Sequence, residues 1–269
     1  MVICEEAPID VSTPTGPMRC AIYKPTAAGK YPGVVFFSEI FQITGPVRRF
    51  AQMLAGHGYI VAVPEIFHEL LPTGTVLGYD KPGSDSGNAC KIGKPVSAYD
   101  EDARAALAAL KAHPACTGAL ASVGICIGGH LAYRAAMHEG VRAGVCFYAT
   151  DIHKGSLGSG GDDSMARTLR GDLAAEMLMI WGRQDPHIPQ EGRRAVYDAM
   201  TAAEKVERTG KSPWGGFSWL EFNAAHAFMR DEGGTGRYNP ELARVCFEVV
   251  FQFLSRRMSE GDRGGVVVQ

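Results

Sequence analysis

The sequence lacks the features that mark several large classes of protein. Its seven cysteines are odd in number and never spaced Cys-x-x-Cys, which argues against a disulfide framework and against a zinc cage. No run approaches the roughly 18 apolar residues that span a membrane. Lys and Arg total 27 against 29 Asp and Glu, without a long run of one sign. Nothing therefore favours a nucleic acid or an anionic membrane as a partner.

The segment MVICEEAPIDV lacks the basic start and long apolar run of a signal peptide. Unpaired cysteines are typical of a reducing compartment. We therefore expect a soluble, cytoplasmic protein, either a monomer or a small homo-oligomer.

Apolar strand-like runs alternate with segments of helical periodicity along most of the 269 residues. The first two runs, 3–13 and 17–25, predict an antiparallel pair at the edge of a sheet. The remaining strands are expected at 31–39, 59–67, 119–125, 143–149, 176–182 and 217–222, and helices at 45–57, 98–113, 126–139, 189–203 and 239–257. This alternation predicts an α/β fold whose mostly parallel central sheet has helices on both faces. We expect one domain over residues 1–257 and a peripheral tail at 258–269.

Two segments, 68–97 and 153–163, break the pattern because they are rich in Gly, Ser and Asp, the first also in Pro. They are long for plain connections, and such loops are usually functional or mobile. Cys90 and Cys116 are expected in loops, and both are interpreted as structural thiols. Ligands of parallel sheets bind at the carboxyl ends of the strands, so the chemistry is sought in the loops that follow them.

Gly-Ile-Cys-Ile-Gly at 124–128 stands between a predicted strand and a predicted helix. This pattern is typical of a nucleophile elbow, a tight turn that holds its central side chain above the first turn of the helix. The helix dipole there favours a thiolate, and the N–H of Ile127 would face a developing oxyanion. The alternative interpretation is that Cys126 is a small, inert core residue.

A thiol nucleophile needs a base, and the base needs an orienting group. Asp185 follows the strand EMLMIWG, and His226 follows the strand FSWLEF, which gives the order nucleophile, acid, histidine. The alternatives are a turn aspartate before Pro186 and a histidine of a surface loop. None of the other seven histidines gives this order.

Two further charged residues stand out. Glu39 follows an early strand, where it would lie near the corner formed by Cys126, although an exposed turn glutamate fits equally well. Arg230 lies one helical turn beyond His226. Its guanidinium could hold a substrate carboxylate, or it could be a solvated charge.

These motifs resemble the dienelactone hydrolase family, a branch of the α/β-hydrolases. The resemblance rests on SEIF, GICIGG, GRQDP and HAFMR and extends from about Tyr31 to Phe253. It implies the α/β-hydrolase fold and a triad of Cys126, Asp185 and His226, without a metal or an organic cofactor.

The same resemblance implies roles for four further residues. Glu39 would hydrogen-bond the resting thiol and help to generate the thiolate when the substrate arrives. The backbone N–H groups of Ile40 and Ile127 would form the oxyanion hole. Arg230 would hold the substrate carboxylate.

The sequence departs from the family pattern at a second carboxylate-binding arginine. The family carries this arginine between the second parallel strand and the nucleophile, whereas residues 65–98 contain no arginine. Lys81, Lys91 or Lys94 could take its place.

The sequence therefore predicts hydrolysis of a small lactone or ester, which could carry a carboxylate, through a cysteine acyl-enzyme. One alternative is a thiol enzyme similar to glutamine amidotransferases, although these pair the cysteine with a His-x-Glu segment that is missing around His226. The other is a non-enzymatic relic that binds a ligand or senses oxidants through Cys126.

Overall fold

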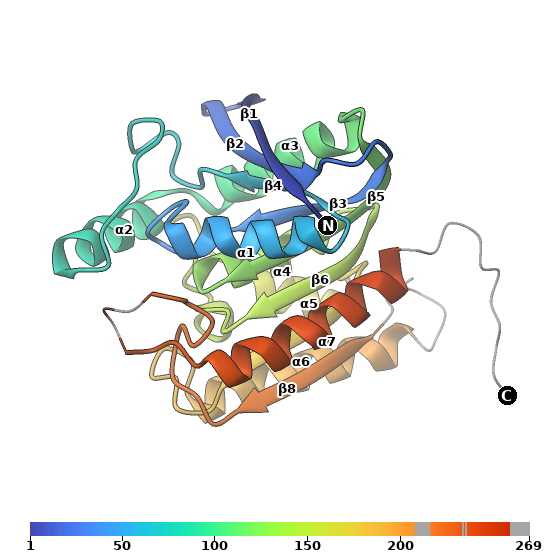
Figure 1. The fold of residues 1–269 in the computed structure, drawn as a ribbon. Coiled ribbons are helices and arrows are strands. Elements are labelled where there is room, and N and C mark those ends of the chain that lie inside the picture. Colours follow the sequence, from blue (N-terminus) through green and yellow to red (C-terminus); the bar gives the residue numbers. More distant parts are fainter. Residues whose placement is uncertain (208–215, 233, 235, 259–269) are drawn as a thin grey trace, which may run out of the picture.

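An eight-stranded sheet runs through the centre of the molecule (Figure 1). The computed structural model describes residues 1–207, 216–232, 234 and 236–258. The expected tail at 258–269 therefore lies almost wholly outside the described residues. The strands are β1 (Ile3–Thr13), β2 (Gly16–Pro25), β3 (Tyr31–Phe37), β4 (Ile60–Pro64), β5 (Cys116–Ile125), β6 (Val141–Phe147), β7 (Glu176–Gly182) and β8 (Phe217–Phe222).

The sheet order is β1-β2-β4-β3-β5-β6-β7-β8. Strands β1, β2 and β4 pair antiparallel, and all pairs from β4 to β8 are parallel. This arrangement confirms the predicted mostly parallel sheet with an antiparallel edge at the amino-terminal end of the chain.

The helices follow strands, and most of them cover the sheet. They are α1 (Gly45–Gly56), α2 (Lys81–Gly93), α3 (Val96–Ala112), α4 (Ile127–Ala135), α5 (Ser164–Arg170), α6 (Gln190–Glu207) and α7 (Pro240–Met258), with a short 3₁₀ turn at Ile152–Lys154. In Figure 1, α1 and α7 lie in front of the sheet, and α3, α4 and α6 lie behind it. None of the described helices is both long and apolar enough to cross a bilayer.

Burial explains why the inner strands could be recognised. Every residue of β4 and of β7 is buried, since helices cover both faces of the sheet there. Such strands appear as continuous apolar runs rather than as alternating patterns. Edge strand β8 is only half-buried.

Helix α2 corrects the expectation that 68–97 is a loop. Its sequence, KPGSDSGNACKIG, is rich in residues that form helices poorly. Capping and packing hold it instead, because the Asp80 side chain accepts the Gly83 N–H at 2.8 Å and Gly87 sits against the carbonyl of Ile40. The loop assignments of Cys90 and Cys116 were wrong, since Cys90 lies in α2 and Cys116 opens β5.

Candidate active site

The turn from β5 into α4 places Cys126 at the carboxyl edge of the sheet. Its backbone has φ 60° and ψ −125°, a conformation that non-glycine residues rarely adopt. A Cβ on Gly124 would come within 1.8 Å of the Gly128 carbonyl oxygen, and one on Gly128 within 2.1 Å of the Phe37 carbonyl oxygen. Strand and helix approach so closely that only glycine fits at both positions, which gives this turn the geometry of a nucleophile elbow.

His226 and Asp185 come from the loops after β8 and β7 and meet beside Cys126. The Nδ1 atom of His226 lies 2.6 Å from Oδ2 of Asp185. A carboxylate only accepts, so Nδ1 carries the proton in this bond. The other Asp185 oxygen accepts the backbone N–H of His187 at 2.8 Å, which fixes the orientation of the carboxylate.

The charges around His226 favour its protonated form. Burial alone lowers the pKa of His226, but the neighbouring Cys126 sulfur and the Asp185 carboxylate together raise it to about 10. The raised pKa therefore favours the imidazolium form of His226 next to the Cys126 sulfur.

Glu39 and Arg230 form a buried ion pair next to this group. Nε of Arg230 donates to the Glu39 oxygens at 3.0 and 3.2 Å, and a second guanidinium nitrogen also donates to Oε2. The Tyr79 hydroxyl donates to Glu39 at 3.1 Å, and the Arg230 guanidinium lies 4.2 Å from the centre of the Tyr79 ring. Glu39 thus faces Arg230 and Tyr79, and among the contacts of the described residues none joins its carboxylate to the Cys126 sulfur.

The expected oxyanion-hole residues, Ile40 and Ile127, follow the neighbouring strands β3 and β5. Ile127 is the first residue of α4, so its N–H has no acceptor within the helix. Ile40 follows Glu39 after β3 and lines the cavity into which Cys126 opens.

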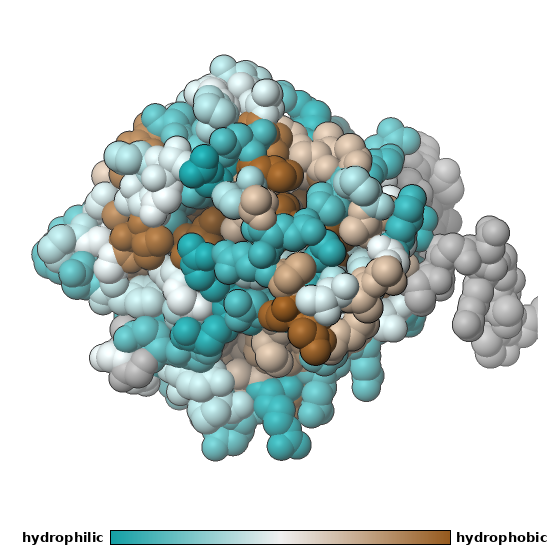
Figure 2. Space-filling model, turned by 45° about the horizontal axis from the view of Figure 1, so that its top comes forward, coloured by the Kyte–Doolittle hydropathy of each residue, from teal (hydrophilic) through white to brown (hydrophobic). Residues whose placement is uncertain are grey.

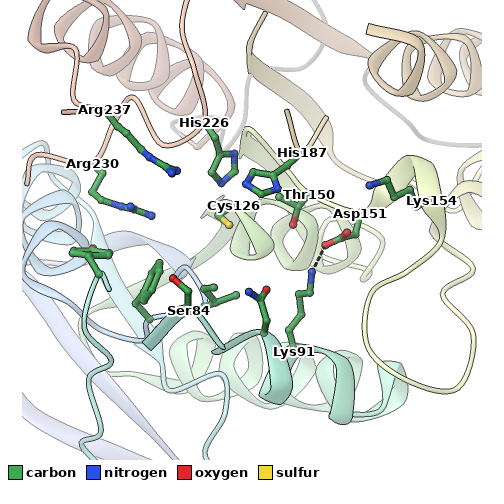
Figure 3. A pocket seen from close by; sticks show the side chains of 14 residues that line it. Ser84, Lys91, Cys126, Thr150, Asp151, Lys154, His187, His226, Arg230 and Arg237 are labelled. Atoms are coloured by element: carbon green, nitrogen blue, oxygen red, sulfur yellow. Dashed lines mark hydrogen bonds and ion pairs between the residues drawn. The ribbon is translucent and has the colours of Figure 1, made fainter. Parts of the chain in front are cut away.

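That cavity measures about 400 Å³, and α2 forms one of its walls. The residues that line it are Ile40, Phe41, Tyr79, Ser84, Asn88, Lys91, Cys126, Thr150, Asp151, Lys154, His187, His226, Arg230 and Arg237. Figure 3 shows Arg230 and Arg237 pointing into it from one side, with Lys91 joined to Asp151 on the other. Four cationic side chains around one small cavity suit a substrate that carries negative charge.

The three candidate lysines occupy different environments. Lys91 lines the cavity and contacts Asp151 at 2.9 Å. Lys81 is 84% exposed and pairs with Asp85. Lys94 is fully buried and does not line the cavity. Among the three, Lys91 alone lies where it could contact a molecule next to Cys126.

Lys94 belongs to a separate buried cluster of charges. His68, Glu69 and Asp102 are close enough together to hold a metal ion. The Lys94 ammonium lies between the two carboxylates, 2.7 Å from Glu69 and 2.5 Å from Asp102, and also donates to the carbonyl of Ile66. This cluster therefore already contains a cation, and its geometry is that of an internal ion pair.

The comparisons with known proteins show the family and the fold of this chain. The model of the dienelactone hydrolase family matches residues 18–258. The chain belongs to the dienelactone hydrolase family. It is 38% identical over 258 residues to a Saccharomyces cerevisiae protein assigned as a carboxymethylenebutenolidase, covering 93% of this chain and 90% of that protein. The carboxymethylenebutenolidase of Pseudomonas sp. strain P51 is 24% identical, covering 88% of this chain and 90% of that protein.

Solved structures show the fold of this dienelactone hydrolase family member. A Klebsiella pneumoniae protein assigned as a dienelactone hydrolase superimposes with a TM-score of 0.78 at 22% identity, covering 95% of this chain and all of that one. The chain is therefore an ester or lactone hydrolase of the carboxymethylenebutenolidase type with the α/β-hydrolase fold. Nothing in these comparisons supports the amidotransferase-like or relic alternatives.

Sequence reasoning missed several residues of the cavity. His187 packs against His226 with ring centroids 4.7 Å apart, and only its position two residues after Asp185 hinted at this. Asp151, Lys154 and Arg237 also line the cavity. Asp151 and Arg237 come from irregular segments, and Lys154 from a single 3₁₀ turn, where no periodic pattern indicates the direction of a side chain.

Proposed function

We propose that this hydrolase cleaves a small lactone or ester through a Cys126 nucleophile and a covalent acyl-enzyme. The observation that carries the proposal is the 2.6 Å contact between His226 and Asp185 at the cavity into which the strained Cys126 elbow opens. Nucleophile, base and orienting acid thus follow strands β5, β8 and β7, and together they form the set of groups that acyl transfer uses.

In the proposed reaction the Cys126 thiolate attacks the carbonyl carbon, and the N–H groups of Ile127 and Ile40 stabilise the oxyanion. The His226 imidazolium then donates its proton to the leaving oxygen as the C–O bond breaks. The neutral imidazole next takes a proton from water, whose oxygen attacks the thioester and releases the acid and the thiolate. Asp185 keeps the imidazole oriented and stabilises its cationic form.

In this proposal, Glu39 and Arg230 make deprotonation of the Cys126 thiol depend on the binding of a negatively charged substrate. A substrate carboxylate that binds Arg230 competes with Glu39 for the guanidinium. The released Glu39 carboxylate can then accept the proton of a resting Cys126 thiol. Lys91 supplies a second cation, in place of the arginine that is missing from 65–98. A cytoplasmic location is part of the proposal and is supported by all seven cysteines being free thiols.

The test follows the decrease in ultraviolet absorbance as cis- or trans-dienelactone is hydrolysed. The wild type, Cys126→Ala and Cys90→Ala are compared. Cys90 is a matched control because it is as buried as Cys126, at 9% exposure, but does not line the cavity. We expect Cys126→Ala to lose all turnover and Cys90→Ala to retain it. His226→Ala should be slower by about 10²–10⁴-fold, as for loss of a general base. Wild-type turnover in Cys126→Ala would refute the proposal.

A further inference from the structure

The hydroxyl group of Tyr148 is buried next to the candidate active site without a hydrogen-bond partner among the described residues. The side chain is fully buried. Tyr133, which is equally buried, has its hydroxyl 2.5 Å from Thr168 Oγ1. A buried hydroxyl without a partner is destabilising, so its retention asks for an explanation.

The backbone of Tyr148 is also strained. The residue directly follows β6 at the carboxyl edge of the sheet, and its φ is 36°. Bulky residues at positive φ are uncommon, and such strain is often found at functional sites. Tyr148 therefore has two independent destabilising features, a strained backbone conformation and a buried hydroxyl without a hydrogen-bond partner among the described residues.

The Tyr148 side chain lies against the candidate base of the proposed reaction. Its ring packs 5.0 Å from the ring of His226 and 5.4 Å from that of Phe228. Burial raises the pKa of Tyr148 well above its usual value, and the Glu39 carboxylate is the charge that raises it most. The hydroxyl therefore keeps its proton and can act only as a donor toward an anion.

Glu39 is the anion that changes partners in the proposed function. In this structure Glu39 is held by Arg230 and by Tyr79. A substrate anion that takes Arg230 leaves the Glu39 carboxylate fully buried without its counter-ion until it takes the Cys126 proton, which is strongly unfavourable unless a new donor is available.

We infer that the Tyr148 hydroxyl donates a hydrogen bond to the Glu39 carboxylate when a substrate anion occupies Arg230. This inference rests on the proposed function and deepens it, because it makes Tyr148 a residue that determines specificity for anionic lactones. The hydroxyl is unpartnered in this structure because its acceptor is still bound to Arg230. Tyr148 is a positioning residue, since it acts through Glu39 and not on the reacting atoms.

The inference is tested with Tyr148→Phe on two substrates, trans-dienelactone, which carries a carboxylate, and 4-nitrophenyl acetate, which is neutral. Losing one hydrogen bond to a charged group should lower kcat/KM for the lactone by about 10- to 100-fold, mainly through KM. The neutral ester leaves Glu39 on Arg230, so its kcat/KM should fall far less. Tyr133→Phe is the control and should leave both activities intact.

Stability separates this role from a structural one. Tyr148→Phe removes no hydrogen bond of the resting protein, so its urea midpoint should equal or exceed that of the wild type, whereas Tyr133→Phe should lower it. Equal losses on both substrates, or no loss on the lactone, would overturn the inference while the hydrolase stands. A wild type that hydrolyses only the neutral ester would also overturn it. A wild type inactive on both would instead refute the proposed function, and the inference with it.

Discussion

Three side chains carry the proposed chemistry, and each has a different structural constraint. Cys126 is held in a strained conformation by the chain on both sides. His226 is buried between the thiol and Asp185. Asp185 uses one oxygen for His226 and the other for the backbone of His187. The imidazole therefore has one orientation available, which is the requirement for repeated proton transfer at a fixed sulfur.

The raised pKa of His226 predicts how its contribution to stability depends on pH. The imidazole binds its proton more tightly in the folded than in the unfolded protein, so its stabilisation is complete below the unfolded pKa near 6.5 and is lost as pH rises through about 10. The free energy of unfolding should therefore differ most between wild type and His226→Gln at about pH 6, and least at about pH 10. Urea unfolding of both proteins between about pH 6 and pH 10 measures this difference in the free energy of unfolding. A difference that widens as pH rises would contradict the raised pKa of His226.

At the scale of elements, the sequence predicted the buried strand β7 and the half-buried edge strand β8 at their observed bounds, and β4 within a few residues. β4 and β7 appear in the sequence as continuous apolar runs. The predicted ends of β5, β7 and β8 gave the positions of the loops that follow these three strands. Those loops hold Cys126, Asp185 and His226, and the structure brings His226 into contact with Asp185 at the cavity that Cys126 also lines. Helix α2 was missed because its Gly and Ser residues oppose helix formation, and contacts far along the chain stabilise it.

The elbow itself gives a prediction for β5 and α4. Gly128→Ala should destabilise the protein by at least about 2 kcal/mol, because its Cβ would overlap the Phe37 carbonyl oxygen of β3, which cannot move without displacing the strand. Gly93→Ala is the control, since a Cβ there meets nothing within 4 Å and alanine favours helix. Chemical denaturation compares the two. Equal stability of both variants would show that close packing does not define this turn.

At the scale of the whole molecule, the central sheet brings residues together that lie far apart in the chain. Glu39 and Arg230 are separated by 191 positions and form a buried ion pair. Their individual placement after β3 and β8 could be predicted, but their pairing could not, because side-chain direction in a loop follows no period. The surface in Figure 2 mixes hydrophilic areas with small, separate hydrophobic patches, and the oligomeric state stays a prediction.

The central claim is that Cys126 forms a covalent acyl-enzyme. The most direct measurement is the mass of the wild type quenched in acid during turnover of 4-nitrophenyl acetate, followed by peptide mapping. We predict a single acetyl group on the peptide that contains Cys126, and none on the Cys126→Ala variant. Turnover without such an adduct, or an acetyl group on another residue that appears at the rate of turnover, would contradict the account.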